Sequence, residues 1–219
     1  MNSAIIQLLV LAGIAVFLVL RLRNVLGTRD GYEPTVERGR DPASKPVRDF
    51  EVIEGGPDRD ISDNVDLESR AGKAFGSMKR IESEFSVSGF LDGARQAYEI
   101  ILMAFEGDDL ETLRGFLSAD VYESFETVIK NRQAQNLTVK ANFIGVREIK
   151  ITDAMFDSIN NEAEITIKFV GEITSCVNNV DGEVVEGDPD VIKRQKDVWT
   201  FARIIGNENP NWELVATGD

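Results

Sequence analysis

The chain has 219 residues, of which 42% are apolar, and a formal net charge of −14 at pH 7. This length fits one domain of ordinary size with accessory segments. The acidity excludes nucleic-acid binding through the whole surface, which needs clustered Lys and Arg, and we predict no nucleic-acid partner. The single cysteine, Cys176, excludes an internal disulfide, and the absence of His removes the commonest general base and metal ligand.

The first segment is an uncharged apolar run. Residues 3–20 would rise about 27 Å as a helix, close to the roughly 30 Å hydrocarbon core of a bilayer. We therefore predict a transmembrane anchor over residues 1–26, with residues 3–20 in the lipid bilayer. Arg21, Arg23 and Arg29 follow the run, so the positive-inside rule places the rest of the chain in the cytoplasm. A cleaved signal peptide and a buried core helix are the competing interpretations.

The next segment, residues 27–63, changes sharply in composition. Four of the six prolines lie here, mixed with Gly and charged residues and with few large apolar side chains. We predict a disordered tether, which would hold the following domain near the membrane without fixing its position.

Residues 66–85 carry apolar side chains at steps of three and four, which predicts an amphipathic helix. The apolar face consists of Leu67, Ala71, Phe75, Met78, Ile81 and Phe85. This face either docks on a membrane or a partner protein, or packs on the chain's own domain. Gly72 and Gly76 each cost about 1 kcal/mol relative to Ala in a helix, so the segment needs docking to be ordered.

The stretch from Ser88 to Phe105 predicts the central core helix. Its apolar positions follow the 3.6-residue period and are Phe90, Leu91, Ala94, Ala97, Tyr98, Ile101, Leu102 and Phe105, with Ile100, Met103 and Ala104 widening the stripe. We expect Ser88 to cap the N-terminus and Gly107 to end the helix.

After this helix the pattern changes from helices to strands. We predict short helices over Leu110–Leu117 and Ala119–Ala134. Alternation then predicts strands over 137–143, 163–169, 171–185 as a hairpin turning at Asp181-Gly182, 198–205 and 212–216, with a bulge or bend at Gly145. Helices followed by antiparallel strands indicate the α+β class, with helices packed on one face of a curved sheet that encloses a cone.

Three runs resemble a known family: FLDGARQAYEIILMAFEGDDLETLRGFLSADVYESF, DVWTFAR and PNWELVAT. They are similar to the C-terminal domain of mitochondrial inner-membrane translocase subunit 44 and its TimA-type bacterial relatives, over residues 67–218. The resemblance implies a nuclear transport factor 2-like cone over residues 64–219. It also implies a membrane-held adaptor in protein transport, insertion or envelope assembly, at the cytoplasmic side of a bacterial inner membrane.

The partners implied are unidentified membrane or chaperone-associated proteins, and the resemblance implies no cofactor and no enzyme activity. The chain departs from the mitochondrial protein at its N-terminal side, where an anchor and a Pro-rich tether replace the segment that binds the motor chaperone. The chaperone and channel contacts therefore do not carry over. Residues 66–85 match the family's membrane-recruiting helices in position.

Two alternatives remain beside the adaptor. A cone that binds a lipid or another small ligand would be lined by Tyr98, Leu102, Phe105, Phe143, Phe169, Trp199 and Trp212. An isomerase or hydratase would need a buried carboxylate and a tyrosine donor, for which Tyr98, Tyr122 and Asp197 are the candidates.

Two further features indicate no site. The spacing in 181–190, DGEVVEGDPD, does not match a helix-loop-helix calcium loop. Cys176 has no His to activate it, so we interpret it as a structural thiol. We predict no metal ligand and no catalytic residue.

Overall fold

The computed structural model describes residues 58–218. The predicted anchor and residues 27–57 of the predicted tether lie outside the described residues. Within 58–218, no helix is long and apolar enough to cross a membrane.

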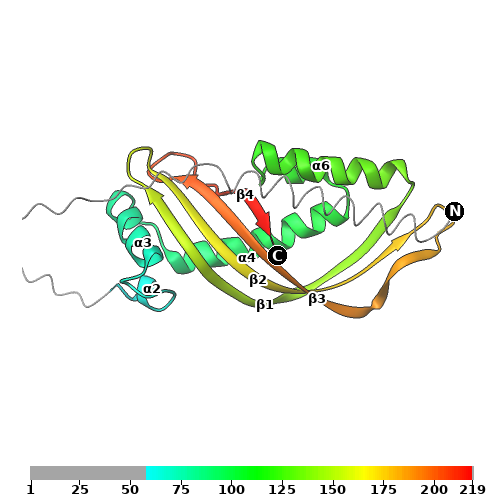
Figure 1. The fold of residues 1–219 in the computed structure, drawn as a ribbon, viewed down its shortest axis with the longest axis horizontal. Coiled ribbons are helices and arrows are strands. Elements are labelled where there is room, and N and C mark those ends of the chain that lie inside the picture. The colour runs from blue at the N-terminus through cyan, green and yellow to red at the C-terminus, as the bar shows by residue number, and fades with distance from the viewer. Residues whose placement is uncertain (1–57, 219) are drawn as a thin grey trace, which may run out of the picture. The chain divides into compact units, whose positions relative to one another are not determined.

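Five helices come first in the described part of the chain and a four-stranded sheet follows (Figure 1). The helices are α2 (Arg59–Ser62), α3 (Arg70–Ile81), α4 (Val87–Glu106), α5 (Leu110–Arg114) and α6 (Ala119–Ala134). The strands are β1 (Thr138–Asp157), β2 (Glu162–Asn178), β3 (Val184–Ile204) and β4 (Glu213–Gly218). The predicted α+β class and the order of helices before strands are confirmed.

The sheet is antiparallel, with its strands in chain order β1-β2-β3-β4. Figure 1 shows the strands curving around α4, with α6 beyond α4 on the same side of the sheet. Helices on one concave face are consistent with the expected cone. The register of β1 against β2 shifts between Phe143 and Gly145, which confirms the predicted bulge at Gly145.

The strands are longer and fewer than predicted. β2 continues through Gly171, and β3 continues through Pro189, where the sequence pattern indicates interruptions. Gly171 pairs with Gln195 in regular register, whereas the register shift between Ile173 and Ser175 accommodates Pro189, and pairing resumes beyond it. The hairpin turn predicted at Asp181-Gly182 is confirmed, because β2 pairs with β3 across residues 179–183. Its first strand is not separate from the predicted strand 163–169, since both belong to β2.

The core lies between α4 and the concave face of the sheet. Tyr98 and Ile101 of α4 and Ile165, Ile167 and Phe169 of β2 are completely buried. Burying each such side chain contributes about 1.5 to 3 kcal/mol. Ile100, which was predicted to widen this stripe, is instead 40% exposed.

The N-terminus of α4 differs from the prediction. The cap is Ser86, whose Oγ accepts from the Gly89 N–H at 3.1 Å, and Ser88 lies inside the first turn. Asp60 of α2 explains the shift, because its carboxylate accepts from the Val87 N–H at 2.7 Å and the Ser88 N–H at 2.8 Å. Gly107 is the C-cap, as predicted.

The helix α2 lies in the segment that was predicted as tether. Ile61 is 3% exposed and joins the core, and Asp60 binds the start of α4. Folded structure therefore begins by residue 58, and residues 58–63 belong to the domain.

Candidate functional site

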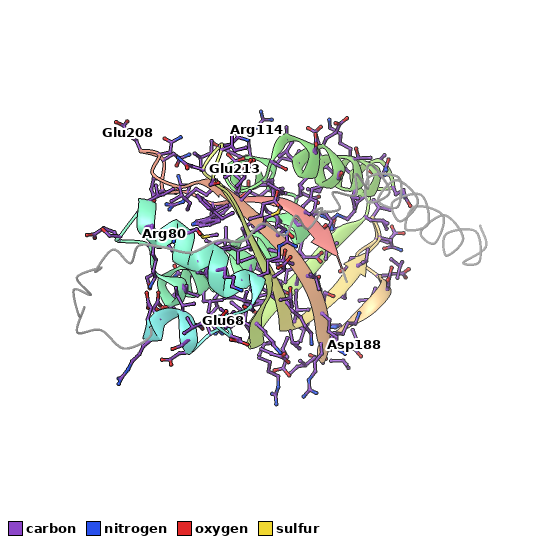
Figure 2. The ribbon with its side chains drawn as sticks, turned by 60° about the vertical axis from the view of Figure 1, so that its left-hand side comes forward. Glu68, Arg80, Arg114, Asp188, Glu208 and Glu213 are labelled. Carbon is purple, nitrogen blue, oxygen red and sulfur yellow. The ribbon has the colours of Figure 1, made fainter. Side chains whose placement is uncertain are left out.

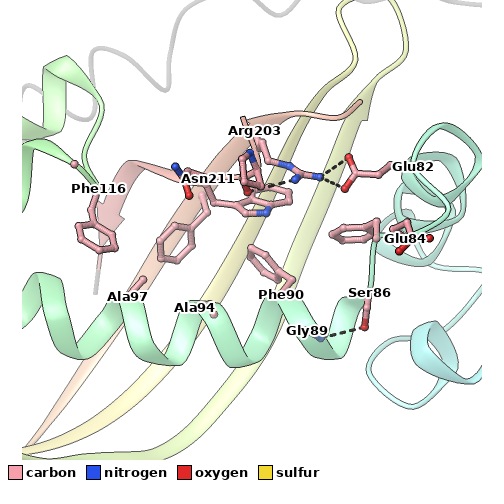
Figure 3. Close-up of a pocket in the computed structure, with 16 residues that line it drawn as sticks. Glu82, Glu84, Ser86, Gly89, Phe90, Ala94, Ala97, Phe116, Arg203 and Asn211 are labelled. Atoms are coloured by element: carbon pink, nitrogen blue, oxygen red, sulfur yellow. Dashed lines mark hydrogen bonds and ion pairs between the residues drawn. The ribbon is translucent and has the colours of Figure 1, made fainter. Parts of the chain in front are cut away.

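A pocket of about 590 Å³ lies beside the N-terminal half of α4 (Figure 3). Four segments line it: residues 82–86 between α3 and α4, residues 89–97 of α4, residues 115–116 after α5, and the β3–β4 hairpin from 201 to 212. The pocket therefore exists only when segments from both halves of the domain come together.

Small residues of α4 make room for the pocket. Gly89, Gly93 and Ala97 recur every four residues and so share one face of the helix, with Ala94 beside them. A Cβ atom added at Gly93 would meet no atom within 4 Å. The helix thus presents a nearly side-chain-free surface to the pocket.

Aromatic side chains form the opposite boundary. The ring centroids of Phe90 and Trp212 lie 4.7 Å apart. The ring centroid of Phe85 lies 6.2 Å from that of Trp212, and the ring centroid of Phe201 lies 6.2 Å from that of Phe90. Phe116 adds a further ring to the lining (Figure 3). These rings and the small residues make the interior mainly apolar.

An ion pair closes one end of the pocket. Nη2 of Arg203 lies 2.7 Å from both carboxylate oxygens of Glu82, and the Gly206 N–H donates to Glu82 at 3.1 Å. The Arg203 guanidinium also lies over the Trp212 ring at 5.2 Å. The Arg203 side chain is 8% exposed, and its Nε has no hydrogen-bond partner among the described residues.

The environment of Glu82 keeps it ionised. Burial raises the pKa of its carboxyl, but the hydrogen bonds from Arg203 and Gly206 and the Arg203 charge outweigh burial and hold the pKa below its ordinary value. An ionised carboxylate paired with arginine is not a proton donor at neutral pH. The pocket therefore suits binding of an apolar group, with a charged pair at one end, better than acid-base chemistry.

We expect the substitution Glu82→Gln to lower the free energy of unfolding by about 1 to 2 kcal/mol at neutral pH. The amide oxygen keeps one bond to Arg203, but the buried guanidinium loses its counter-charge. Because folding lowers the pKa of Glu82, its ionised carboxylate contributes to the free energy of unfolding above about pH 4.3, the ordinary glutamate value. This contribution decreases as the pH falls below that value. Urea unfolding at pH 7 and at pH 3 measures both effects; an unchanged difference between wild type and variant at the two pH values would contradict the ion-pair explanation.

The family model described as Tim44-like domain matches residues 71–219, which cover nearly the whole described domain. The chain belongs to the Tim44-like domain family. This confirms the family part of the resemblance seen in the sequence.

Two curated relatives match about half of this Tim44-like chain. Probable mitochondrial import inner membrane translocase subunit tin-44 of Caenorhabditis elegans is 30% identical over 118 residues, which is 52% of this chain and 27% of the relative. Human mitochondrial import inner membrane translocase subunit TIM44 is 26% identical over 117 residues, 52% of this chain and 25% of the relative. The matched region thus spans about a quarter of each relative's length.

One solved structure is also similar. The crystal structure of the intermembrane space region of chloroplast protein ARC6 has a TM-score of 0.40 and 10% identity, covering 58% of this chain and 94% of that structure.

The aromatic residues predicted to line a cone are mostly core residues of the Tim44-like domain. Tyr98 stacks on Phe169 at 4.4 Å between ring centroids, and Trp199 lies 4.7 Å from Tyr98. Leu102 is buried, and Phe143 contacts Tyr98. These side chains fill the space between α4 and the sheet.

Two predicted lining residues lie elsewhere. Phe105 packs on Phe125 of α6 at 4.8 Å, and the guanidinium of Arg132 lies over the Phe105 ring. Trp212 lines the pocket described above. It is the member of the predicted set that the structure places there.

The residues considered for an enzyme are partly brought together. Tyr98 donates to Oδ2 of Asp197 at 2.5 Å, across 99 residues of sequence. Burial, followed by the hydrogen bond and charge of Asp197, raises the pKa of the Tyr98 hydroxyl far above its ordinary value. Tyr122 lies apart and accepts from Arg114 at 3.0 Å. The Tyr98 hydroxyl is thus the satisfied polar end of a core side chain.

The apolar face of residues 66–85 packs within the Tim44-like domain, which is the second arrangement that the sequence allowed. Phe75 and Met78 are completely buried, and Ala71 and Phe85 are also buried. Leu67 is half-buried against the core, whereas Ile81 is 45% exposed. The helix itself, α3, is shorter than predicted and ends at Ile81. The role of this face toward a membrane or partner stays a prediction.

Cys176 and the 181–190 segment lie at the end of β2 and around the start of β3. Cys176 is a buried free thiol in β2, near the Asn178 side chain. The 181–190 segment holds the end of the 179–183 turn and the exposed start of β3. No group of three or more metal-ligating side chains occurs among residues 58–218.

The sequence reasoning missed the Glu82–Arg203 pair and the small residues of α4. The ion pair joins residues 121 positions apart, so no local pattern indicates it. The repeat of Gly89, Gly93 and Ala97 at four-residue spacing was a usable signal, because such a stripe predicts a helix face without bulky side chains.

Proposed function

We propose that this Tim44-like chain is a membrane-tethered adaptor that binds protein partners at the cytoplasmic face of a bacterial inner membrane. The main support is the family match, which extends over residues 71–219. Both named relatives are mitochondrial import inner membrane translocase subunits, and each matches about half of this chain. We infer a role in protein transport, insertion or envelope assembly.

The proposed topology rests on the sequence. Residues 3–20 would anchor the chain as a single span, and residues 27–57 would link the anchor to a domain that begins by Asp58. An anchor followed by a Pro-rich link supports the TimA-type bacterial assignment within the family. The partners would be membrane or chaperone-associated proteins, bound by the domain and not by the anchor.

A non-enzymatic role agrees with the chemistry of the described residues. Tyr98 and Asp197 are engaged with each other inside the core, and Glu82 is neutralised by Arg203. Neither pair combines a free proton donor with an open pocket.

Affinity purification of the full chain from crosslinked membranes tests the adaptor. The control is an anchor-plus-tether chain ending at Pro57, because α2 belongs to the domain. We expect defined proteins that require residues 58–219 for recovery, identified by mass spectrometry. Recovery of the same proteins with the control, or of no protein that needs the domain, would overturn the proposal.

The pocket favours a second function, the binding of a lipid or other small apolar ligand. Its walls are aromatic rings and small residues, and the Glu82–Arg203 pair lies at one end, where a polar head group would meet it. Such a ligand would be held at the membrane by the same anchor.

Filling the pocket tests this second function. We expect Gly93→Leu to lower the affinity for oleate, used as a probe, by about tenfold, since the new side chain would occupy the space beside Phe90. Gly76→Leu is the matched control, because Gly76 also has open space around its Cβ position but lies on α3, away from the pocket lining. Calorimetric titration measures both. Equal binding by the two variants, or no binding by the wild type, would contradict the ligand function.

A further inference from the structure

The first half of β3 forms an uncovered edge of the sheet. β4 pairs with β3 only from Val198 to Ala202. In the part of the chain that the structure describes, no strand covers the outer edge of residues 184–197. A free edge offers backbone N–H and C=O groups to another strand, but the charges, the register shift and Pro189 of this edge limit regular backbone pairing, so its side chains decide what it binds.

A large bulge interrupts this edge. Asp188 pairs with Ser175 and Lys193 pairs with Ile173, so the four residues 189–192 of β3 lie opposite the single residue Thr174 of β2, and three residues are extra. The Asp188 carboxylate accepts from the Asp190 N–H at 2.9 Å and shapes the bend. Val191 and Ile192, which follow it, are 51% and 54% exposed. Asp188 lies on the outside of β3, at the end far from α3 (Figure 2).

The charges along this edge are separated by sign. Glu186, Asp188 and Asp190 lie before the exposed pair Val191–Ile192, and Lys193, Arg194 and Lys196 lie after it. All six side chains belong to exposed residues. The edge is therefore acidic on one side of an apolar centre and basic on the other.

We propose that this edge, residues 186–196 of β3, binds a second copy of the chain in an antiparallel, two-fold symmetric contact. Rotation about an axis near Val191–Ile192 places the acidic side of one copy against the basic side of the other, twice. In a two-fold contact residue i meets residue j and residue j meets residue i, so a single edge supplies both partners. Glu186 then lies near Lys196 of the second copy, and Asp190 lies near its Lys193.

Charge complementarity selects a second copy over another occupant. A basic peptide would satisfy the acidic side but meet like charge at Lys193, Arg194 and Lys196. An acidic peptide would satisfy the basic side but meet like charge at Glu186, Asp188 and Asp190. A second copy satisfies both sides and covers the exposed Val191 and Ile192 at the axis, where burial of apolar surface contributes most.

A charge-swap experiment tests the contact with two variants of the full chain in detergent. Glu186→Lys with Asp190→Lys makes the edge mainly basic, and Lys193→Glu with Lys196→Glu makes it mainly acidic. These four residues are exposed, and Asp188 and the Arg194–Glu172 pair at 3.1 Å are left intact. Each variant is prepared in two forms that carry different tags. Capture through one tag, followed by detection of the other, then reports association between two copies.

We expect wild-type copies to capture each other, with capture falling as salt is raised. Each variant should capture itself about tenfold less than wild type, because both charge pairs become repulsive. A mixture of the basic-edge and acidic-edge variants should regain capture, which also shows that both are folded. Absence of wild-type capture, undiminished self-capture of either variant, or failure of the mixture to recover would each overturn the proposal. If copies associated through the predicted anchor, both variants would capture themselves as well as wild type does, and this result would count against the proposed edge contact.

Discussion

The substitution Gly72→Ala is expected to lower the free energy of unfolding by about 3 kcal/mol, although alanine is the better helix former. A Cβ atom at Gly72 would lie 2.4 Å from the carbonyl oxygen of Asp66 and 2.7 Å from the Cα of Leu67. Both atoms belong to the backbone of the turn before α3, so they cannot rotate away. The helix or the turn would have to move, and Phe75 and Met78 would lose contacts in the core.

Gly76 supplies the matched control on the same helix. Nothing lies within 4 Å of an added Cβ at Gly76, so Gly76→Ala should raise the free energy of unfolding by about 0.5 to 1 kcal/mol. Urea unfolding followed by tryptophan fluorescence suits both variants, because Trp199 and Trp212 are the chain's two tryptophans and both lie in the domain. Equal effects at the two positions would show that α3 does not pack against residues 66–67 as described.

The substitution Asp60→Asn is expected to cost about 2 to 4 kcal/mol at neutral pH. The carboxylate accepts from the backbone N–H groups of Val87 and Ser88 and lies 2.7 Å from Nζ of Lys79. An amide places N–H donors against these donors and leaves the Lys79 charge without one of its partners. The start of α4 would lose its attachment to α2 and α3.

The effect of Asp60→Asn should depend on pH in a defined direction. Burial raises the pKa of Asp60, but the bonds from Lys79, Ser88 and Val87 outweigh it and hold the pKa well below its ordinary value. Because the pKa of Asp60 is lower in the folded state, its ionised carboxylate stabilises the fold above about pH 4, the ordinary aspartate value. This stabilisation is lost as the pH falls further. The difference between wild type and variant should therefore shrink below pH 4.

Asp63→Asn serves as the control for this prediction. Asp63 is an exposed residue that follows α2, and its carboxylate makes no contact comparable to those of Asp60. We expect a change within about 0.5 kcal/mol at any pH. A constant difference for Asp60→Asn from pH 7 to pH 3 would refute the proposed role of the ionised carboxylate.

The elements that local pattern specifies were predictable. The helical period over 88–105 indicates a core helix, and α4 spans this stretch with Gly107 as its C-cap. Alternation in 163–169 indicates a half-buried strand, and this segment lies inside β2. These patterns suffice because the period of apolar residues must match the geometry of the element that buries them.

The pocket was beyond local pattern. Aromatic residues can fill a core or line a space, and sequence alone does not separate the two uses. Tyr98, Phe169 and Trp199 stack on one another and fill the core, whereas Trp212 lies at the pocket beside Phe90. Which use each ring takes depends on neighbours that are distant in the sequence, such as Phe90 for Trp212.

By itself the sequence determined the class of the domain, the order of its elements, the core stripe of α4 and the family resemblance that the family match confirms. The class, the order and the core stripe depend on periodicity and turn residues, which act over a few positions, whereas the resemblance depends on matching sequence runs. Only the tertiary structure decided that Ser86 and not Ser88 caps α4, that Gly72 and not Gly76 requires glycine, and that Glu82 pairs with Arg203. Each of these depends on contact between segments distant in the chain, where packing and charge pairing outweigh local preference.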